Sequence, residues 1–288
     1  MKKLILVLIC CFIVSESKAQ ANDTEAFLYN ISIGGLFGTI GSLINKKPED
    51  KTSKLILKGF TQGALGGYLT FESKRLLRVA VKHENSNYYW GSKIVNAAGN
   101  SIIEGTALNR KFGEQWNMNI GFLRLEFKPS GEKKFQPRIM PIALTFTVGV
   151  ALQTKFEINK SLKTGQFIFS TDDERFDETG SIGVAFPGCI VLKDENKDQL
   201  DLMSHEIVHL YQDYDFNVFN SYIDKPIKKL SEKTNFTQLM NKIFYYDFHQ
   251  IPLSIVYDIE SNGNYYYDNH FEHEAGYYSY TLDPNLKN

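Results

Sequence analysis

Small residues recur at every fourth position in the first part of the chain, and this spacing predicts packed helices. There are three such trios: Gly34, Gly38 and Ser42; Gly59, Gly63 and Gly67; and Ala97, Ser101 and Gly105. Residues four apart share one helix face, and small side chains on that face let two backbones approach closely. We therefore expect a helical hairpin, formed by residues 27–45 and 55–71 around a polar turn, followed by a third packed helix.

Two other interpretations of this glycine-rich region stay open. The hairpin could insert into a membrane, but Lys58 and Gln62 interrupt its second segment. The third helix also carries polar side chains that are costly in lipid, namely Lys93, Asn96, Asn100 and Glu104. Membrane association through residues 27–71 is therefore not favoured. A glycine-rich β-hairpin is the other alternative, because glycine in strands is also a positional signal.

After Gly113 the pattern changes to short apolar runs separated by proline and glycine, which is typical of strands and turns. The runs cover residues 119–127, 140–152, 166–170 and 182–192. They predict an antiparallel sheet over about 118–192. Helices are expected after it, at Lys197–Asp213, 226–246 and 248–256. The fold class is α+β, with a glycine-rich helical region at 20–112 and a second domain at 113–288.

The first residues have the form of a secretory signal peptide. Lys2 and Lys3 precede the unbroken apolar run Leu4–Val14, and small residues precede a cleavage point after Ala19. A transmembrane helix needs about 20 apolar residues, so this run is too short to span a bilayer. We expect residues 1–19 to be removed and the protein to be exported, as a periplasmic or secreted protein that is associated with the envelope in one interpretation.

Composition narrows the class of protein further. The chain has 288 residues, of which 43% are hydrophobic and 23% charged, as in ordinary globular proteins. Its formal net charge of −1 argues against a strongly basic nucleic-acid binder. After removal of the leader only Cys189 remains, so an internal disulfide is excluded. Apolar neighbours predict that Cys189 is a buried, inert thiol.

The strongest chemical signal is the sequence His205-Glu206-Ile207-Val208-His209, in the helix expected at Lys197–Asp213. Residues one turn apart project from one helix face, so both imidazoles can bind one Zn²⁺. Glu206 follows the first histidine and can act as the base that activates water. The alternative is that the two histidines are hydrogen-bonded core residues or part of a polar surface.

These residues resemble the signature of the zincin metallopeptidases. In that superfamily an edge strand beside the active-site helix pairs with the extended substrate, and residues 183–192 have a strand pattern. The segment His270–Ser279 is similar to the second helix of the gluzincins. The resemblance implies that Glu272 is the third metal ligand and that Ala275 is the small residue three positions later. Gly276 occupies the place of an aspartate that supports a ligand histidine in that family.

Several assignments around this centre stay open. Glu274, His270 and His273 are rival third ligands. Asp213 and Asp268 are candidates to replace the missing aspartate. A hydrogen-bond donor to the transition state is also expected, and the eligible residues are Tyr257, Tyr265, Tyr277 and His249.

The resemblance covers about residues 180–282, and the first 110 residues match no specific family. It implies an exported zinc-dependent peptidase that hydrolyses peptide or protein substrates, with Zn²⁺ on His205, His209 and Glu272 and with Glu206 as the base. The alternative is an envelope-associated structural or interaction protein, in which the glycine-faced helices are the working part and the metal site is structural or vestigial.

Overall fold

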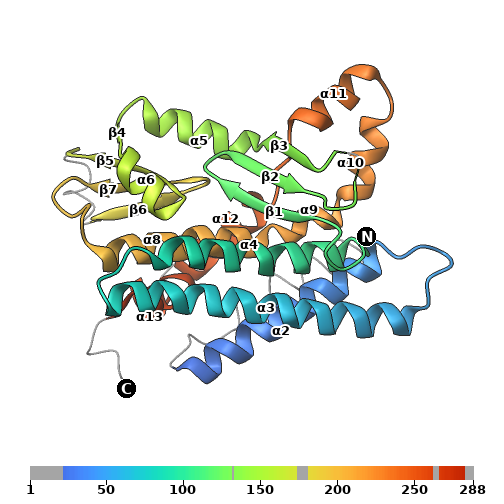
Figure 1. Cartoon of the computed structure of the whole chain (residues 1–288), viewed down its shortest axis with the longest axis horizontal. Helices are drawn as coiled ribbons and strands as arrows, with labels where there is room; N and C mark the ends of the chain where they lie inside the picture. Colours follow the sequence, from blue (N-terminus) through green and yellow to red (C-terminus); the bar gives the residue numbers. More distant parts are fainter. Residues whose placement is uncertain (1–21, 132, 174–180, 262–265, 283–288) are drawn as a thin grey trace.

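The computed structural model describes residues 22–131, 133–173, 181–261 and 266–282, and Figure 1 shows their arrangement. Within these ranges the protein is α+β, as predicted. The expected leader at 1–19 lies outside the described residues. The helices are α2 (Asp23–Ile44), α3 (Thr52–Lys82), α4 (Tyr88–Ala107), α5 (Pro141–Ala151), α6 (Ile158–Thr164), α8 (Leu200–Phe216), α9 (Val218–Tyr222), α10 (Asp224–Ser231), α11 (Asn235–Ile243), α12 (Gln250–Ser261) and α13 (His270–Ser279), with the 3₁₀ turn η1 (Tyr266–Asp268).

Helices α2 and α3 form the predicted hairpin, and their backbones meet at the glycines. A Cβ atom added to Gly63 would lie 2.2 Å from the carbonyl oxygen of Gly34, and one added to Gly67 would lie 2.0 Å from that of Asn30. Larger residues cannot occupy these positions without moving a helix, which explains why glycine is present despite its cost of about 1 kcal/mol relative to alanine in a helix. The helical interpretation is confirmed, and the β-hairpin alternative is wrong.

Helix α4 packs against α3 through a different face from the one expected. A Cβ on Gly99 would lie 2.6 Å from the Gly66 carbonyl oxygen, whereas a Cβ on Gly105 would meet nothing within 4 Å. Ser101 faces strand β1 (Trp116–Ile120), where its hydroxyl accepts a hydrogen bond of 2.7 Å from the amide of Asn117. The predicted third trio is therefore wrong as a helix-packing face, because two positions along a helix change direction by about 200°.

The polar residues of α4 are buried rather than solvated. Glu104 accepts two hydrogen bonds from the buried guanidinium of Arg124, at 2.7 and 2.8 Å. Lys93 donates to Gln166 at 2.8 Å, and Asn96 donates to Ser73 at 3.1 Å. Buried polar groups require such partners, so α4 serves as a polar seam between the helical hairpin and the strands.

The strands form two sheets instead of one antiparallel sheet. Strands β1, β2 (Leu123–Phe127) and β3 (Phe135–Ile139) make an antiparallel meander. The second sheet has the order β4-β5-β7-β6, made from β4 (Lys155–Phe156), β5 (Phe167–Thr171), β6 (Gly183–Phe186) and β7 (Cys189–Lys193). In it β5 and β7 are parallel. The expected run at 182–192 is a hairpin that turns at Gly188, where φ is +81°.

The apolar run at 140–152 was expected to be a strand and is instead helix α5. Pro141 begins the helix, a position that suits its fixed φ and its missing amide hydrogen. The carboxylate of Asp247, about a hundred residues further along the chain, accepts hydrogen bonds from the amides of Ile142 at 3.1 Å and Ala143 at 2.8 Å. This tertiary contact satisfies the first turn of a helix and is invisible to any local pattern.

Helix α8 lies at the centre of the molecule and contacts α3, α13, α12 and β6 (Figure 1). Ile207, Val208 and Leu210 of α8 are part of the hydrophobic core. Cys189 belongs to a separate cluster, where its thiol is free and buried, as expected. The helix expected at 226–246 is divided into α10 and α11 by a capping box at Thr234. The helix expected at 248–256 is α12.

Among the described residues, helix α2 is the one that is long and apolar enough to cross a membrane by length and composition, and 44% of its apolar window is buried within the fold. Asn22 caps the start of this helix, because its side chain accepts hydrogen bonds from the amides of Thr24 and Glu25. Membrane association through residues 27–71 stays an alternative that the sequence does not favour.

Candidate metal centre

Helix α8 presents two histidines from one face, one turn apart. His205 is buried and His209 is half-buried, and their Nε2 atoms lie 3.1 Å apart. Glu206 follows His205 directly, so its side chain leaves the helix about 100° away from that of His205. Glu206 is buried. The helical periodicity predicted from the spacing is thus present in the structure.

Helix α13 brings a carboxylate to the two imidazoles. Glu272 Oε2 lies 3.2 Å from His205 Nε2 and 3.3 Å from His209 Nε2. Ala275 is fully buried between the helices, at the place where the sequence predicted a small residue. The structure therefore brings together His205, His209 and Glu272, the three residues that the resemblance named as ligands.

The geometry of this triad suits a tetrahedral metal ion. In a tetrahedral zinc site with bonds of about 2.0–2.1 Å, neighbouring donor atoms are separated by about 3.3–3.4 Å. The three donor separations here are 3.1, 3.2 and 3.3 Å. Two imidazole nitrogens and one carboxylate oxygen are also a donor set that zinc accepts. Within the described part of the chain this is the group of histidine and acidic residues whose geometry can hold a metal.

The rival third ligands lie elsewhere. Glu274 faces away from the histidines and forms an ion pair with Lys74 at 3.0 Å. His270 is buried beside Tyr29, with ring centroids 4.8 Å apart, and neither of its ring nitrogens has a hydrogen-bond partner among the described residues. His273 is on the half-buried side of α13 and is not part of the triad.

Electrostatics couple the members of the triad. Burial opposes ionisation of Glu272, but the adjacent His209 and His205 outweigh that effect and hold the pKa of its carboxyl well below the usual range. Burial also disfavours a charge on His209, yet Glu272 outweighs it and raises the pKa of His209 to about 9. Burial lowers the pKa of His205. Without a metal, His209 is therefore protonated beside an ionised Glu272, and a metal ion would displace that proton.

The side chain of Glu206 packs against the edge strand β6. Its carboxylate is so near Gly183 that a Cβ there would meet Oε1 at 2.7 Å. Burial raises the pKa of Glu206 to about 7; the charge of His209 lowers it, and that of Glu272 raises it further. A carboxyl group whose pKa is near neutrality can both accept and return a proton.

Two tyrosines approach the triad from α12 and η1. The hydroxyl of Tyr257 donates to Glu272 Oε1 at 2.6 Å, and that of Tyr266 lies 3.4 Å from His205 Nε2. Tyr257 was a candidate from the sequence, whereas Tyr266 was missed because no motif marks it. Tyr265 lies outside the described residues.

The other two candidate donors are engaged elsewhere. Tyr277 donates to Asp23 at 2.6 Å, on the side of α13 that faces α2. His249 is buried and lies 3.1 Å from Asp213. Neither residue is placed to contact a substrate at the triad.

The hydrogen bonds to the outer ring nitrogens of His205 and His209 come from residues that the sequence did not indicate. Thr281 Oγ1 lies 3.0 Å from His205 Nδ1, and Gln212 Oε1 lies 2.8 Å from His209 Nδ1. Asp213 is instead bound to His249, and Asp268 is exposed in η1. The two aspartates suggested as replacements at this position were therefore wrong. A three-residue helical spacing links His209 to Gln212, which is the one signal that could have found it.

A cleft of about 720 Å³ opens beside the triad and Glu206. Its walls are the edge strand β6 on one side and helices α5 and α12 on the others, and most of its surface is apolar. The apolar side chains that line it include Phe146, Val184, Phe186, Leu210, Ile251 and Ile255. The cleft thus combines a few convergent polar groups with an apolar wall, as ligand-binding sites commonly do.

Comparison with protein-family models, with curated proteins and with solved structures returned no match to this chain.

Proposed function

We propose that this chain is a zinc-dependent metallopeptidase of the zincin type, exported to the periplasm or the cell exterior, that hydrolyses peptide bonds. The observation that carries the proposal is the triad of His205, His209 and Glu272, whose donor separations of 3.1–3.3 Å fit three corners of a tetrahedron. The fourth corner is left to a water or a substrate, as in catalytic rather than structural zinc sites. A bound Zn²⁺ would supply Lewis acidity there, polarising the scissile carbonyl and acidifying water.

Glu206 is the base in this proposal. Its carboxylate lines the same cleft as His209 and Glu272, and the residue is 4% exposed. It takes the proton of the attacking water and passes it to the leaving amine, a role for which a pKa of about 7 is well suited. The hydroxyls of Tyr257 and Tyr266 are the donors nearest the triad, so they are assigned to the oxygen that becomes negatively charged.

The edge strand β6 is assigned to substrate binding. It pairs with β7 on one side only, and its other side borders the cleft. An extended peptide can add to such an edge through backbone hydrogen bonds, with side chains filling neighbouring pockets. Because the walls from α5 and α12 are apolar, the preferred substrates carry bulky apolar side chains next to the scissile bond.

The proposal is tested by measuring zinc content and peptide hydrolysis on the purified protein. We expect about one zinc per chain and cleavage of an unstructured protein such as casein, abolished by a chelator and restored by zinc. Glu206→Gln is the matched control, since it should retain zinc and lose hydrolysis. A wild-type protein that carries zinc and cleaves neither casein nor a mixed peptide library would contradict the proposal.

A second candidate is an envelope-associated structural or interaction protein with a structural or vestigial metal site. The observation in its favour is α2, an apolar helix of membrane-spanning length that contributes no side chain to the proposed chemistry. Zinc binding without hydrolysis, together with co-sedimentation of the protein with membranes, would favour this candidate over the peptidase.

A further inference from the structure

Gln212 is a buried residue of α8 that contacts one of the three triad members. It follows His209 by three positions, so both side chains lie on one helix face. Its Oε1 atom lies 2.8 Å from His209 Nδ1, and only 4% of the residue is exposed. The contact joins the ring nitrogen that faces away from the triad.

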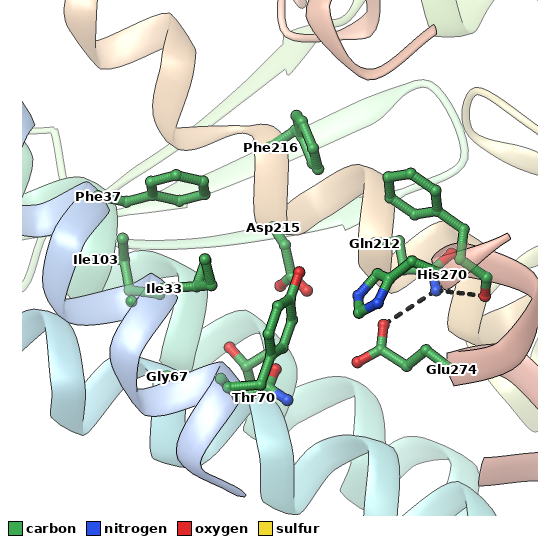
Figure 2. A pocket seen from close by; sticks show the side chains of 14 residues that line it. Ile33, Phe37, Gly67, Thr70, Ile103, Gln212, Asp215, Phe216, His270 and Glu274 are labelled. Carbon is green, nitrogen blue, oxygen red and sulfur yellow. Dashed lines mark hydrogen bonds between the residues drawn. The ribbon is translucent and has the colours of Figure 1, made fainter. Parts of the chain in front are cut away.

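The orientation of the Gln212 amide is determined by its other partners. Its Nε2 donates to the carbonyl oxygen of Phe271 at 2.9 Å and to Glu274 Oε2 at 3.0 Å. Figure 2 shows both hydrogen bonds converging on the amide nitrogen. A backbone carbonyl can only accept, so the amide cannot turn over. Its oxygen must face His209, and His209 must present a protonated Nδ1 to it.

This orientation decides which nitrogen of His209 is available to a metal. A neutral imidazole carries one proton. If that proton is on Nδ1, the lone pair is on Nε2, which is the atom 3.1 Å from His205 Nε2 and 3.3 Å from Glu272 Oε2. Gln212 therefore directs the Nε2 lone pair of His209 towards His205 Nε2 and Glu272 Oε2, where a metal ion would bind.

The glycine-rich helices hold the outer end of this chain of contacts. Lys74 of α3 is 1% exposed and contacts both oxygens of Glu274, at 3.0 and 3.1 Å. It also pairs with Asp215 at 2.9 Å. The carboxylate that faces Gln212 is thus anchored by a cation from the helical hairpin, and the contacts run from Lys74 through Glu274 and Gln212 to His209.

We propose that Gln212 is a positioning residue of the metal centre, and that Glu274 and Lys74 hold it in the orientation that makes His209 Nε2 a metal ligand. This inference rests on the proposed function for the identity of the metal. It gives helix α3 a part in the site, because Lys74 belongs to α3 and binds Glu274.

The test measures zinc affinity of the full chain by competition with a chromophoric chelator. Gln212→Met keeps the size of the side chain and removes its acceptor, and we expect affinity to fall about 10–100-fold, as for other residues that hydrogen-bond a ligand histidine. Gln250→Met is the matched control, because Gln250 is also a buried amide, bound to Asp213 at 2.6 Å, and does not contact the triad. It should leave affinity unchanged.

The zinc-loaded wild type supplies a measurement that needs no variant. Nitrogen-15 NMR of His209 should show a proton on Nδ1 that exchanges slowly with solvent. Either of two results would overturn the inference: an unprotonated Nδ1, or a Gln212→Met protein that binds zinc as tightly as the wild type. Failure of the proposed function has a different appearance, namely zinc bound with normal affinity but no peptide hydrolysed.

Discussion

Two interfaces hold this molecule together, and they use opposite means. Between α2 and α3 the closest contacts are made by backbone atoms, with carbonyl groups at the glycines where side chains would otherwise be. Between α8 and α13 the apolar contacts are joined by polar side chains that each have a specific partner: Glu272 with two histidines, and Gln212 with Glu274 and a backbone carbonyl. One interface depends on volume, and the other depends on the identity of donors and acceptors.

The difference separates stability from chemistry. A substitution in the hairpin should cost free energy of unfolding without changing what the triad can bind. A substitution between α8 and α13 should change metal binding or catalysis more than it changes stability. Lys74 is where the two interfaces meet, because it belongs to α3 and pairs with Glu274 of α13.

The largest expected effect is on catalysis alone. Glu206→Gln should lower the rate of peptide hydrolysis by about 10²–10⁴-fold, because an amide cannot take the proton of the attacking water. Zinc content and melting temperature should stay near those of the wild type. Initial rates on a fluorogenic peptide give the comparison, and hydrolysis at the wild-type rate would show that Glu206 is not the base.

The next effect distinguishes the two carboxylates of α13. Glu272→Ala removes a triad member and should weaken zinc binding by more than about 100-fold, beyond the 10–100-fold typical of a residue that only supports a ligand. Glu274→Ala leaves the Phe271 carbonyl to orient Gln212, so its zinc affinity should fall by less than about 10-fold. Chelator competition measures both. The reverse ranking would move the ligand to Glu274.

A smaller effect is expected in the hairpin, where volume is decisive. Gly63→Ala places a Cβ 2.2 Å from a backbone oxygen and should lower the free energy of unfolding by about 1–3 kcal/mol. Gly105→Ala is the matched control, since the added Cβ meets nothing within 4 Å. It should be neutral or stabilising by up to about 1 kcal/mol, the helix preference for alanine. Equal effects of the two variants in urea unfolding would mean that the close contact is absent.

The smallest expected effect concerns Lys93 of α4, the helix between the helical hairpin and the strands. Burial lowers the pKa of its amine to about 7, so between about pH 7 and the ordinary lysine pKa of about 10.4 the unfolded chain binds the extra proton. Stability should therefore rise with pH in that window and fall as the pH drops towards 7. Lys93→Met should remove this dependence and stabilise the protein at pH 7 by about 1–2 kcal/mol, since the lost hydrogen bond to Gln166 offsets part of the gain from removing a buried amine. Urea unfolding at pH 7 and pH 10 tests it; parallel curves for variant and wild type would contradict it.

Local spacing was sufficient for some features of the protein. The four-residue repeat of Gly34–Ser42 and Gly59–Gly67 predicted the hairpin, because residues four apart on a helix always share a face. The same rule placed His205 and His209 side by side. The α+β class also followed from the change of pattern after Gly113.

Tertiary structure decided the rest, because the deciding partners are far apart in sequence. Residues 140–152 are helical because Asp247 satisfies the first amides of α5, although their composition favours a strand. Helix α4 uses Gly99 instead of Gly105 because β1 occupies its other face. The partner of Glu274 is Lys74, 200 residues away in the chain, and no local pattern indicated that pair. Hydrogen bonds and ion pairs depend on distance in space, so a single sequence can name the groups but not pair them.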